Sequence, residues 1–256
     1  MNIPLVSSMA ERCGQTISGI LIAALLSSNA AALELKLRAT TPFKPALDVL
    51  IRQFEASSGH NVLVEYGAGP ALEEALRSGA ACDVVIAPTP QVQSLAKEGL
   101  VKDPATYAQA YLAVGVRDGS PVPDLSTEAA FRSAMIAARR IAYSAGLSGH
   151  VFAEKVEQAG LGAMLKERAQ VVISGPVGAV LMKGQADFGI LQNVELSAVP
   201  GVNLAGPLPG ALAADFPNSI ATCKMAYIEA LQFLNFIRSD AAWYVLERNG
   251  WKASAR

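Results

Sequence analysis

Short apolar runs alternate with helical patterns along most of this chain, and this alternation constrains the fold more than any other feature. The first unit, residues 33–99, contains three apolar runs, each followed by apolar residues at helical spacing that end at a glycine. This order predicts parallel strands joined by right-handed helical crossovers, with the strand-to-helix loops at one edge of the sheet. The predicted strands are 33–39, 62–66 and 83–87, and the predicted helices are 47–54, 71–76 and 91–98.

A second unit of the same kind follows. Its predicted strands are 140–144, 170–173 and 186–192, and its predicted helices are 151–158 and 177–183. Between the units, residues 111–116 are apolar and strand-like, so we expect them to carry the chain from one lobe to the other. Residues 228–246 have an amphipathic pattern and are predicted to form a helix that packs back onto one lobe. The sequence therefore predicts an α/β protein with two lobes.

The composition excludes several functional classes. Hydrophobic residues make up 52% of the chain and charged residues 17%, which is typical of a globular protein. A formal net charge of -1 gives no support to nucleic-acid binding. Three cysteines and two histidines, without C-x-x-C or H-E-x-x-H spacing, predict no metal site. No cofactor is expected either.

The N-terminal residues 1–32 read as a secretory signal peptide. Residues 17–26 form an apolar core, and small residues follow it, so that cleavage is predicted after Ala30 or Ala32. The apolar core is too short for a comfortable membrane span. A retained anchor and a wrongly chosen start are the alternatives. Export to the periplasm would remove Cys13 and leave Cys82 and Cys223 in an oxidising compartment. Those two cysteines could form a disulfide, but both lie in or beside apolar runs, so we expect two separate buried thiols.

Several predicted helices begin in the same way. A capping or permissive residue stands before a proline just after a strand, and one further start lacks the proline. Helix starts present unpaired backbone N–H groups and can hold an anion, and ligands of open α/β sheets bind outside the carboxyl ends of the strands. The alternative is that each loop only caps its helix. The starts are Thr41-Pro42, Gly69-Pro70, Thr89-Pro90, Gly175-Pro176 and Ser148-Gly149.

Three nucleotide-binding or catalytic motifs are incomplete or absent. The run from Gly67 to Leu72 begins like a G-x-G-x-x-G fingerprint, but Leu72 replaces the third glycine, so we reject a dinucleotide. A phosphate-binding G-x-x-x-x-G-K-[ST] is absent. Ser148 lacks the G-x-S-x-G elbow of a nucleophile, and we expect it to be an N-cap. His150 is expected to be a solvated surface residue, with a role as a base as the alternative.

The candidate loops are uncharged, apart from Lys44 in the first turn of the first helix. Lys44 could reach an anion or simply be solvated. Hydroxyls and backbone N–H groups suit a compact, fully ionised anion, which they would hold by hydrogen bonds.

The order of these motifs resembles the periplasmic molybdate-binding proteins of ABC importers. The resemblance is carried by Tyr66-Gly67-Ala68-Gly69, Cys82-Asp83-Val84-Val85-Ile86, Ser148-Gly149 and Gly184-Gln185-Ala186-Asp187-Phe188-Gly189-Ile190, and it covers nearly all of the mature chain. It implies a two-lobed type II periplasmic binding protein fold, with parallel-type sheets flanked by helices and a hinge of crossing strands. It also implies a monomer that delivers a small anion to a membrane permease. The implied lobes are residues 33–112 with 224–256, and residues 113–223.

In molybdate binders, serine hydroxyls, backbone N–H groups and a tyrosine hold the oxyanion. Here Thr40 and Thr41 stand at the place of the serines, Ala68 and Gly69 stand where another serine is expected, and Gln192 stands at the tyrosine position. These departures put molybdate itself in question and leave another small anion open. The predicted contact residues are Thr40, Thr41, Gly67, Ala68, Gly69, Thr89, Ser148, Gly149, Ser174 and Gln192.

A second interpretation comes from the same superfamily. Aconitate isomerase, a periplasmic enzyme, is similar in sequence to molybdate-binding proteins. An isomerase of a small polycarboxylate needs a base, and Lys44 and His150 are the candidates in these loops. We expect a binding protein first and an isomerase second.

Overall fold

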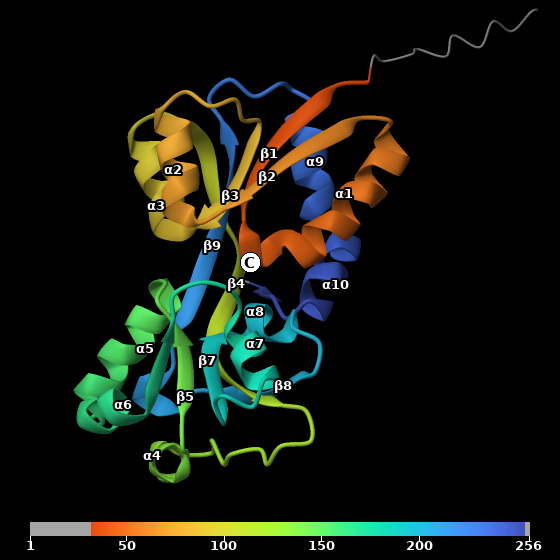
Figure 1. Cartoon of the computed structure of the whole chain (residues 1–256). Coiled ribbons are helices and arrows are strands. Elements are labelled where there is room, and N and C mark those ends of the chain that lie inside the picture. The colour runs from red at the N-terminus through yellow and green to blue at the C-terminus, as the bar shows by residue number, and fades with distance from the viewer. Residues whose placement is uncertain (1–31, 254–256) are drawn as a thin grey trace, which may run out of the picture. The chain divides into compact units, whose positions relative to one another are not determined.

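The structure is a computed structural model that describes residues 32–253 (Figure 1). The predicted signal peptide, apart from its last residue, lies outside the described residues, and so does Cys13.

The first α/β unit forms the parallel strands that the sequence predicts. Strand β1 pairs in parallel with β2 on one side and with β3 on the other. Each strand leads into a helix, and prolines occupy the first helical turns. The elements are β1 (Glu34–Thr40), η1 (Thr41–Phe43), α1 (Lys44–Ser58), β2 (Asn61–Gly67), α2 (Gly69–Arg77), β3 (Val84–Pro88) and α3 (Thr89–Lys97).

Helices cover both faces of this unit (Figure 1). Helix α1 packs with α9 (Ala230–Ile237) on one face, where the rings of Phe54 and Phe233 form a T-shaped pair with centroids 5.1 Å apart. Helices α2 and α3 cover the other face through a smaller apolar cluster that includes Leu76, Val92 and Leu95. Burial on both faces explains why β3 reads as a continuous apolar run, whereas the edge strand β2 has one buried residue, Val62.

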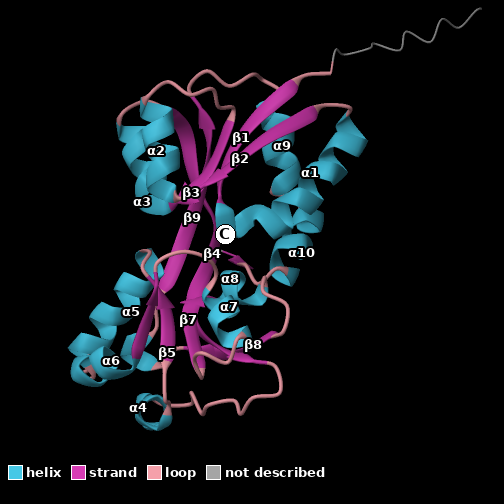
Figure 2. Ribbon diagram, in the orientation of Figure 1, coloured by secondary structure: helices cyan, strands magenta, loops and turns pink. Residues whose placement is uncertain are grey.

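Two long antiparallel strands join the first unit to the second. Strand β4 (Val101–Arg117) pairs with β9 (Asp215–Cys223) along its first part and with β7 (Phe188–Gln192) and β8 (Val202–Pro207) along its last part. The strand order is β2-β1-β3-β9-β4-β7-β5-β6, and Figure 2 shows β4 and β9 running through the middle. The predicted strand 111–116 is therefore the end of a much longer one.

The second α/β unit also has parallel strands at its centre, because β5 pairs in parallel with both β6 and β7. Helix α7 packs on β7 so closely that a Cβ at Gly189 would lie 2.8 Å from the Leu181 side chain. The remaining elements are α4 (Glu128–Ala137), β5 (Ile141–Ser144), α5 (Leu147–Gln158), α6 (Gly162–Arg168), β6 (Ala169–Val172), α7 (Val177–Met182), α8 (Asn193–Ser197) and η2 (Gly210–Leu212).

The C-terminal part corrects the prediction of one helix over 228–246. Two helices occur there, α9 and α10 (Asp240–Arg248), and the chain turns between them at Ser239. The Ser239 hydroxyl accepts a hydrogen bond from the Ala242 N–H at 3.2 Å, which is an N-cap. A cap inside an amphipathic pattern marks a new helix. The described chain ends in β10 (Lys252–Ala253), which pairs with β4.

The pairing of strand β9 changes where the second lobe ends. The sequence-based division assigns residues up to 223 to the second lobe, but β9 pairs with β3 and β4 within the first sheet. We therefore propose that the second lobe ends before Asp215.

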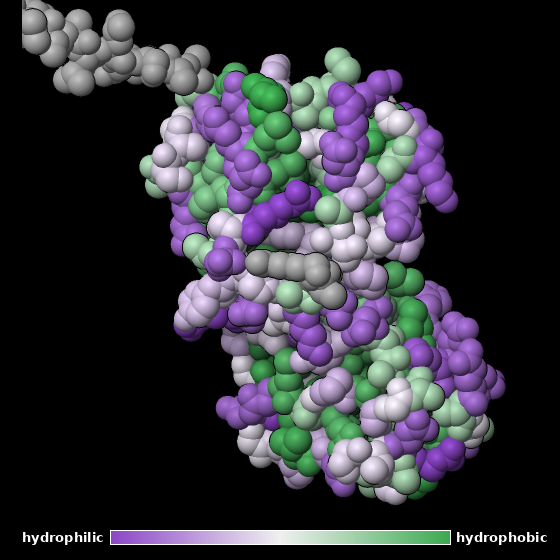
Figure 3. All heavy atoms as spheres, turned by 180° about the vertical axis from the view of Figure 1, so that it is seen from behind, coloured by the Kyte–Doolittle hydropathy of each residue, from purple (hydrophilic) through white to green (hydrophobic). Residues whose placement is uncertain are grey.

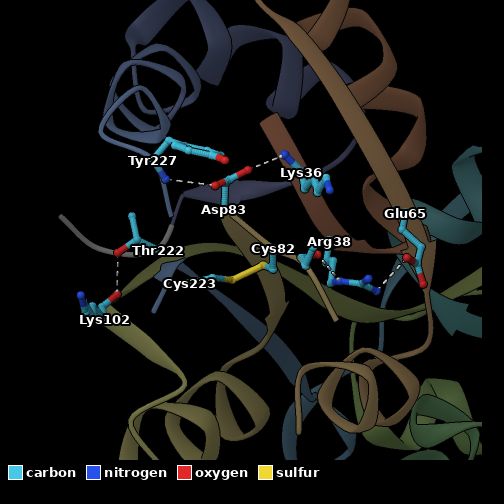
Figure 4. Close-up of a disulfide and its surroundings, with 10 residues drawn as sticks. Lys36, Arg38, Glu65, Cys82, Asp83, Lys102, Thr222, Cys223 and Tyr227 are labelled. Atoms are coloured by element: carbon cyan, nitrogen blue, oxygen red, sulfur yellow. Dashed lines mark hydrogen bonds and ion pairs between the residues drawn. A yellow bond between two sulfur atoms is a disulfide. The ribbon is translucent and has the colours of Figure 1, made fainter. Parts of the chain in front are cut away.

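The two cysteines correct another prediction. Cys82 and Cys223 form a disulfide with a Cα–Cα distance of 5.7 Å, not two separate thiols (Figure 4). The reason is topological, because Cys82 lies just before β3, and β3 and β9 are antiparallel neighbours. The backbone N–H of Cys223 donates to the carbonyl of Asp83 at 2.9 Å. Buried Asp83 also accepts from the backbone N–H groups of Lys36 at 2.7 Å and Tyr227 at 3.1 Å.

Hydrophobic and hydrophilic residues are interspersed over the face shown in Figure 3. Among residues 32–253, no helix has the length and apolar character that crossing a membrane requires.

Candidate anion-binding site

The first two candidate loops are neighbours in the sheet. Thr40 ends β1 and lies opposite Gly67, which ends β2. Thr40 is buried, whereas Thr41, at the start of η1, is exposed. The parallel ladder thus brings the threonine pair next to the glycine loop, as the sequence predicts for adjacent strand ends.

The start of α2 is closely packed. Ala68 is the N-cap residue and Gly69 the first helical residue, and Gly69 is buried. A Cβ at Gly69 would lie 3.1 Å from the Pro88 ring and 3.6 Å from the Gln91 carboxamide carbon. Sequence reasoning missed Gln91, whose Oε1 is buried without a hydrogen-bond partner among the described residues. The position therefore suits glycine, and a polar amide lies against it.

Thr89 connects α3 to one of the crossing strands. Its hydroxyl oxygen lies 2.9 Å from that of Ser219 on β9, and either can donate. Ser219 is buried and lies opposite Ala87 in the ladder. The sequence did not point to Ser219, because nothing in the local pattern indicated that β9 would pair with β3.

The start of α5 differs from the prediction for Ser148. The N-cap is Gly146, and Ser148 lies inside the helix, buried, with its hydroxyl oxygen 3.5 Å from that of Ser144. Gly149 is also buried, and a Cβ there would overlap the carbonyl oxygen of Ser144 and reach the Tyr143 ring at 3.0 Å. Close contact between the end of β5 and the first turn of α5 therefore requires glycine at position 149.

The two remaining candidates also lie at strand ends. Ser174 is exposed and precedes Gly175, whose φ of +81° lies in the left-handed region. Gln192 ends β7 and is the N-cap residue of α8.

Buried Asn193, which sequence reasoning missed, links three segments at this place. Its Oδ1 accepts from the N–H of Tyr111 on β4 at 2.9 Å, and its Nδ2 donates to the carbonyl of Gly250 at 2.6 Å. Trp251, the next residue, stacks on Phe43 of η1 with ring centroids 3.7 Å apart. The C-terminal segment therefore contacts both the start of α8 and the residue that closes η1.

The hydroxyls at these helix starts do not cap the helices. No side-chain capping hydrogen bond forms at η1, α3 or α5. By contrast, Thr127 and Ser239 do cap α4 and α10. The alternative in which the candidate loops serve only as caps therefore loses its main support.

The two alternative catalytic residues have different surroundings. Lys44 begins α1, and its ammonium donates to Asp48 at 2.9 Å. His150 is exposed, and its Nδ1 lies 2.9 Å from the Gly146 carbonyl oxygen within the first turn of α5. The described contacts do not join His150 to Lys44.

One carboxyl group near these loops has an unusual pKa. Glu195 lies in α8, three residues after Gln192, and burial raises the pKa of its carboxyl to about 7. With a pKa of about 7 this carboxyl is partly protonated at neutral pH, and the protonated form does not repel a nearby anion as a carboxylate does.

The arrangement offers uncharged hydrogen-bond donors at strand ends in both units. Such groups suit a small anion. Among residues 32–253, no group of three or more His, Cys, Asp or Glu side chains is placed to hold a metal ion.

A family comparison covers nearly all of the described residues. The sequence model of the bacterial extracellular solute-binding proteins matches residues 35–252. The chain belongs to this family.

Solved structures establish the fold of this solute-binding protein as the two-lobed, type II periplasmic binding protein fold. The substrate binding domain assigned to a molybdenum ABC transporter from Clostridium difficile matches with a TM-score of 0.73 and 19% identity, over 88% of this chain and 100% of that chain. The periplasmic molybdate-binding protein of Azotobacter vinelandii matches with a TM-score of 0.69 and 20% identity, over 86% and 100%. At these identities the likeness concerns the fold alone.

A curated relative of the solute-binding protein is an enzyme. An aconitate isomerase from Pseudomonas sp. is 31% identical over 176 residues, which cover 66% of this chain and 67% of that protein.

Proposed function

We propose that this chain is a periplasmic substrate-binding protein that captures a small anion between its two lobes and delivers it to an ABC importer. The observation that carries the proposal is the set of uncharged donors at strand ends in both sheets. Thr41 and Gly69 lie at helix starts beside the first sheet, and Ser148 and Gln192 lie at helix starts beside the second. The ligand is a molybdate-like oxyanion or a small carboxylate.

Closure of the lobes would provide the capture step. A ligand favours a closed state only if it binds that state more tightly than the open one, which requires contacts from both lobes. Strands β4 and β9 are the connections about which such a movement would occur. The proposal therefore needs contact residues in both sheets.

The first experiment is a thermal-shift screen of the protein from Leu33 onward against molybdate, tungstate, sulfate, phosphate, citrate and both aconitate isomers. A ligand at about a hundred times its Kd stabilises the fold by about 2.7 kcal/mol, which corresponds to a rise in Tm of several degrees. No rise with any of these anions would contradict the proposal.

Site variants then test the contact residues. Thr41→Ala and Ser148→Ala remove hydroxyls at helix starts in different sheets, so each should weaken binding of the anion identified by the screen. Loss of a hydrogen bond to a charged ligand predicts an increase in Kd of roughly 10-fold or more. Thr127→Ala, which alters a hydroxyl that caps α4, is the control for a general effect of losing a threonine. Unchanged affinity in both site variants would contradict the site.

A second candidate function is favoured by the aconitate isomerase relative. The reaction would remove a proton from a carbon beside a carboxylate, move the double bond, and return a proton to another carbon. His150 and Lys44 are the candidates for proton transfer. The test is to incubate the protein with cis- or trans-aconitate and to follow the ratio of the isomers by NMR. Interconversion that His150→Gln abolishes would establish an enzyme, whereas stable isomers leave the binding function.

A further inference from the structure

Lys44 is held in place by side chains from two different elements. Its Nζ lies 2.9 Å from Oδ2 of Asp48, one turn further along α1, and 4.7 Å from the centroid of the Tyr66 ring on β2. The Tyr66 hydroxyl donates to Oδ1 of the same Asp48 at 2.7 Å. The three side chains form a closed network, which gives this lysine a defined orientation.

The network lies beside two of the proposed anion loops. Lys44 follows Thr41 by three residues, and Tyr66 directly precedes Gly67. In the ladder, Tyr66 lies opposite Ala39, one position before Thr40. The residue that carries the ammonium group is thus close in sequence to the threonine pair, and its partner Tyr66 is next to the glycine loop.

The Asp48 carboxylate in the network is ionised and engaged by two partners. Burial acts to raise the pKa of Asp48, but hydrogen bonds from Lys44 and Tyr66 and the charges of Lys44 and Arg52 lower it on balance. Asp48 therefore remains ionised and both of its oxygens are engaged. Asp48 thus orients the ammonium group of Lys44, and the charge of Arg52 also acts on Asp48.

The ammonium group also remains accessible. The Lys44 side chain is 54% exposed, and Asp48 accepts one of its three N–H bonds. The remaining N–H bonds can donate to a ligand without breaking the network.

A positive charge matters because the ten proposed contact residues are all uncharged. They suffice for one compact anionic group. A ligand with two or three carboxylates extends past them, and a further carboxylate that leaves water needs a cation or several donors of its own.

We propose that Lys44 selects a polycarboxylate ligand by pairing with a carboxylate that projects beyond the hydroxyl and backbone N–H groups of the site. This inference rests on the proposed function, since it concerns the same site. Asp48 and Tyr66 are positioning residues that hold the ammonium group where the second carboxylate arrives.

The test compares Lys44→Met with the unaltered protein by isothermal titration calorimetry. The probes are citrate, tricarballylate and trans-aconitate, with molybdate and sulfate as compact anions. We expect Lys44→Met to weaken polycarboxylate binding about 10- to 100-fold, which is the loss expected for one charge-assisted hydrogen bond, and to leave any binding of compact anions nearly unchanged. Lys44→Arg keeps the charge and should retain most of the affinity.

Two further variants complete the design. Lys97→Met alters an exposed lysine in the last turn of α3 and should bind as the unaltered protein does. Tyr66→Phe removes the hydrogen bond to Asp48 but keeps the ring, so the preference for polycarboxylates over compact anions should fall by a smaller factor. A misfolded variant would bind neither polycarboxylates nor compact anions, and it would show no cooperative thermal transition.

The outcomes separate the inference from the function. Equal polycarboxylate affinity in Lys44→Met and the unaltered protein would overturn the role of Lys44 and leave an anion-binding protein. If the unaltered protein binds molybdate or sulfate but none of the polycarboxylates, the role of Lys44 is likewise overturned and an anion-binding protein remains. Failure of the unaltered protein to bind any anion, in this titration or in the thermal-shift screen, would overturn the proposed function and this inference with it.

Discussion

The hydroxyl oxygens of Thr89 and Ser219 lie 2.9 Å apart and join the first residue of α3 to a strand that crosses between the lobes. Ser219 is buried, so removal of its hydroxyl would leave Thr89 to find another partner. Ser219→Ala should lower the free energy of unfolding by about 1 kcal/mol, the usual net value of one hydrogen bond. Thr89→Val should also weaken anion binding if Thr89 contacts the ligand.

The measurement is urea unfolding of both variants together with titration of the anion found in the screen. Thr106→Val alters another threonine that lies opposite Ser219 across the β4–β9 ladder, and it serves as the control. Full affinity in Thr89→Val would remove Thr89 from the set of contact residues.

Gly149 should tolerate no side chain. A Cβ at this position would overlap the Ser144 carbonyl oxygen, so Gly149→Ala forces β5 and α5 apart. Overpacking of this kind typically costs about 1–3 kcal/mol and should displace the helix start that carries Ser148. Gly146→Ala is the matched control, because a Cβ at Gly146 has the Ser144 hydroxyl as its nearest neighbour, at 3.6 Å. Equal melting temperatures for the two variants would contradict the packing argument.

Loss of the disulfide should destabilise the protein strongly. Cys82 and Cys223 are separated by 141 residues, and in the chain-entropy model a cross-link that closes so long a loop removes much freedom from the unfolded chain. The double variant Cys82→Ala/Cys223→Ala should lose about 2–5 kcal/mol of unfolding free energy. Reductant should destabilise the unaltered protein to a similar extent and have no effect on the double variant. A reductant effect on the double variant would point to a different cause.

Glu195 should make stability depend on pH. Burial raises its pKa to about 7 from an ordinary value of 4.5, so the folded protein retains the proton longer than the unfolded chain does. The unfolding free energy should therefore fall as pH rises from about 4.5 to 7, and the deficit should persist above pH 7. Glu195→Gln removes this penalty.

The two proteins should be equally stable near pH 4 and differ by up to about 3 kcal/mol at pH 8, since one pKa unit corresponds to 1.36 kcal/mol. Melting curves across this pH range measure the difference. A constant difference at all pH values would mean that Glu195 does not titrate as burial predicts.

The parallel strands could be predicted from sequence because each is a short run with buried apolar residues that is followed by a helical pattern. Strands β1, β2 and β3 lie within one or two residues of their predicted ends. Strand β9 could not be predicted, since it contains Pro217, and its buried residues Asn218, Ser219 and Thr222 are polar. These polar side chains have hydrogen-bond partners, since the Ser219 hydroxyl meets that of Thr89 and the Thr222 hydroxyl donates to the carbonyl of Lys102. The Asn218 amide donates to the carbonyl of Phe216.

The candidate site, too, could be predicted from sequence only in part. Helix starts could be located from their proline and glycine signals, but contacts between distant segments could not. The missed residues Ser219 and Asn193 act on parts of the chain that are far away in sequence, and so does the disulfide. Local patterns predict where a loop lies, whereas the choice of strand neighbours decides which side chains meet there.

The disulfide also makes part of the polypeptide a closed covalent ring. Residues 82–223 form this ring, which contains β4, the whole second α/β unit and β9, while β1, β2 and the C-terminal helices lie outside it. One proteolytic cut anywhere inside the ring therefore leaves the two fragments bound to each other. Separation of the fragments requires reduction of the Cys82–Cys223 bond as well as cleavage of the backbone.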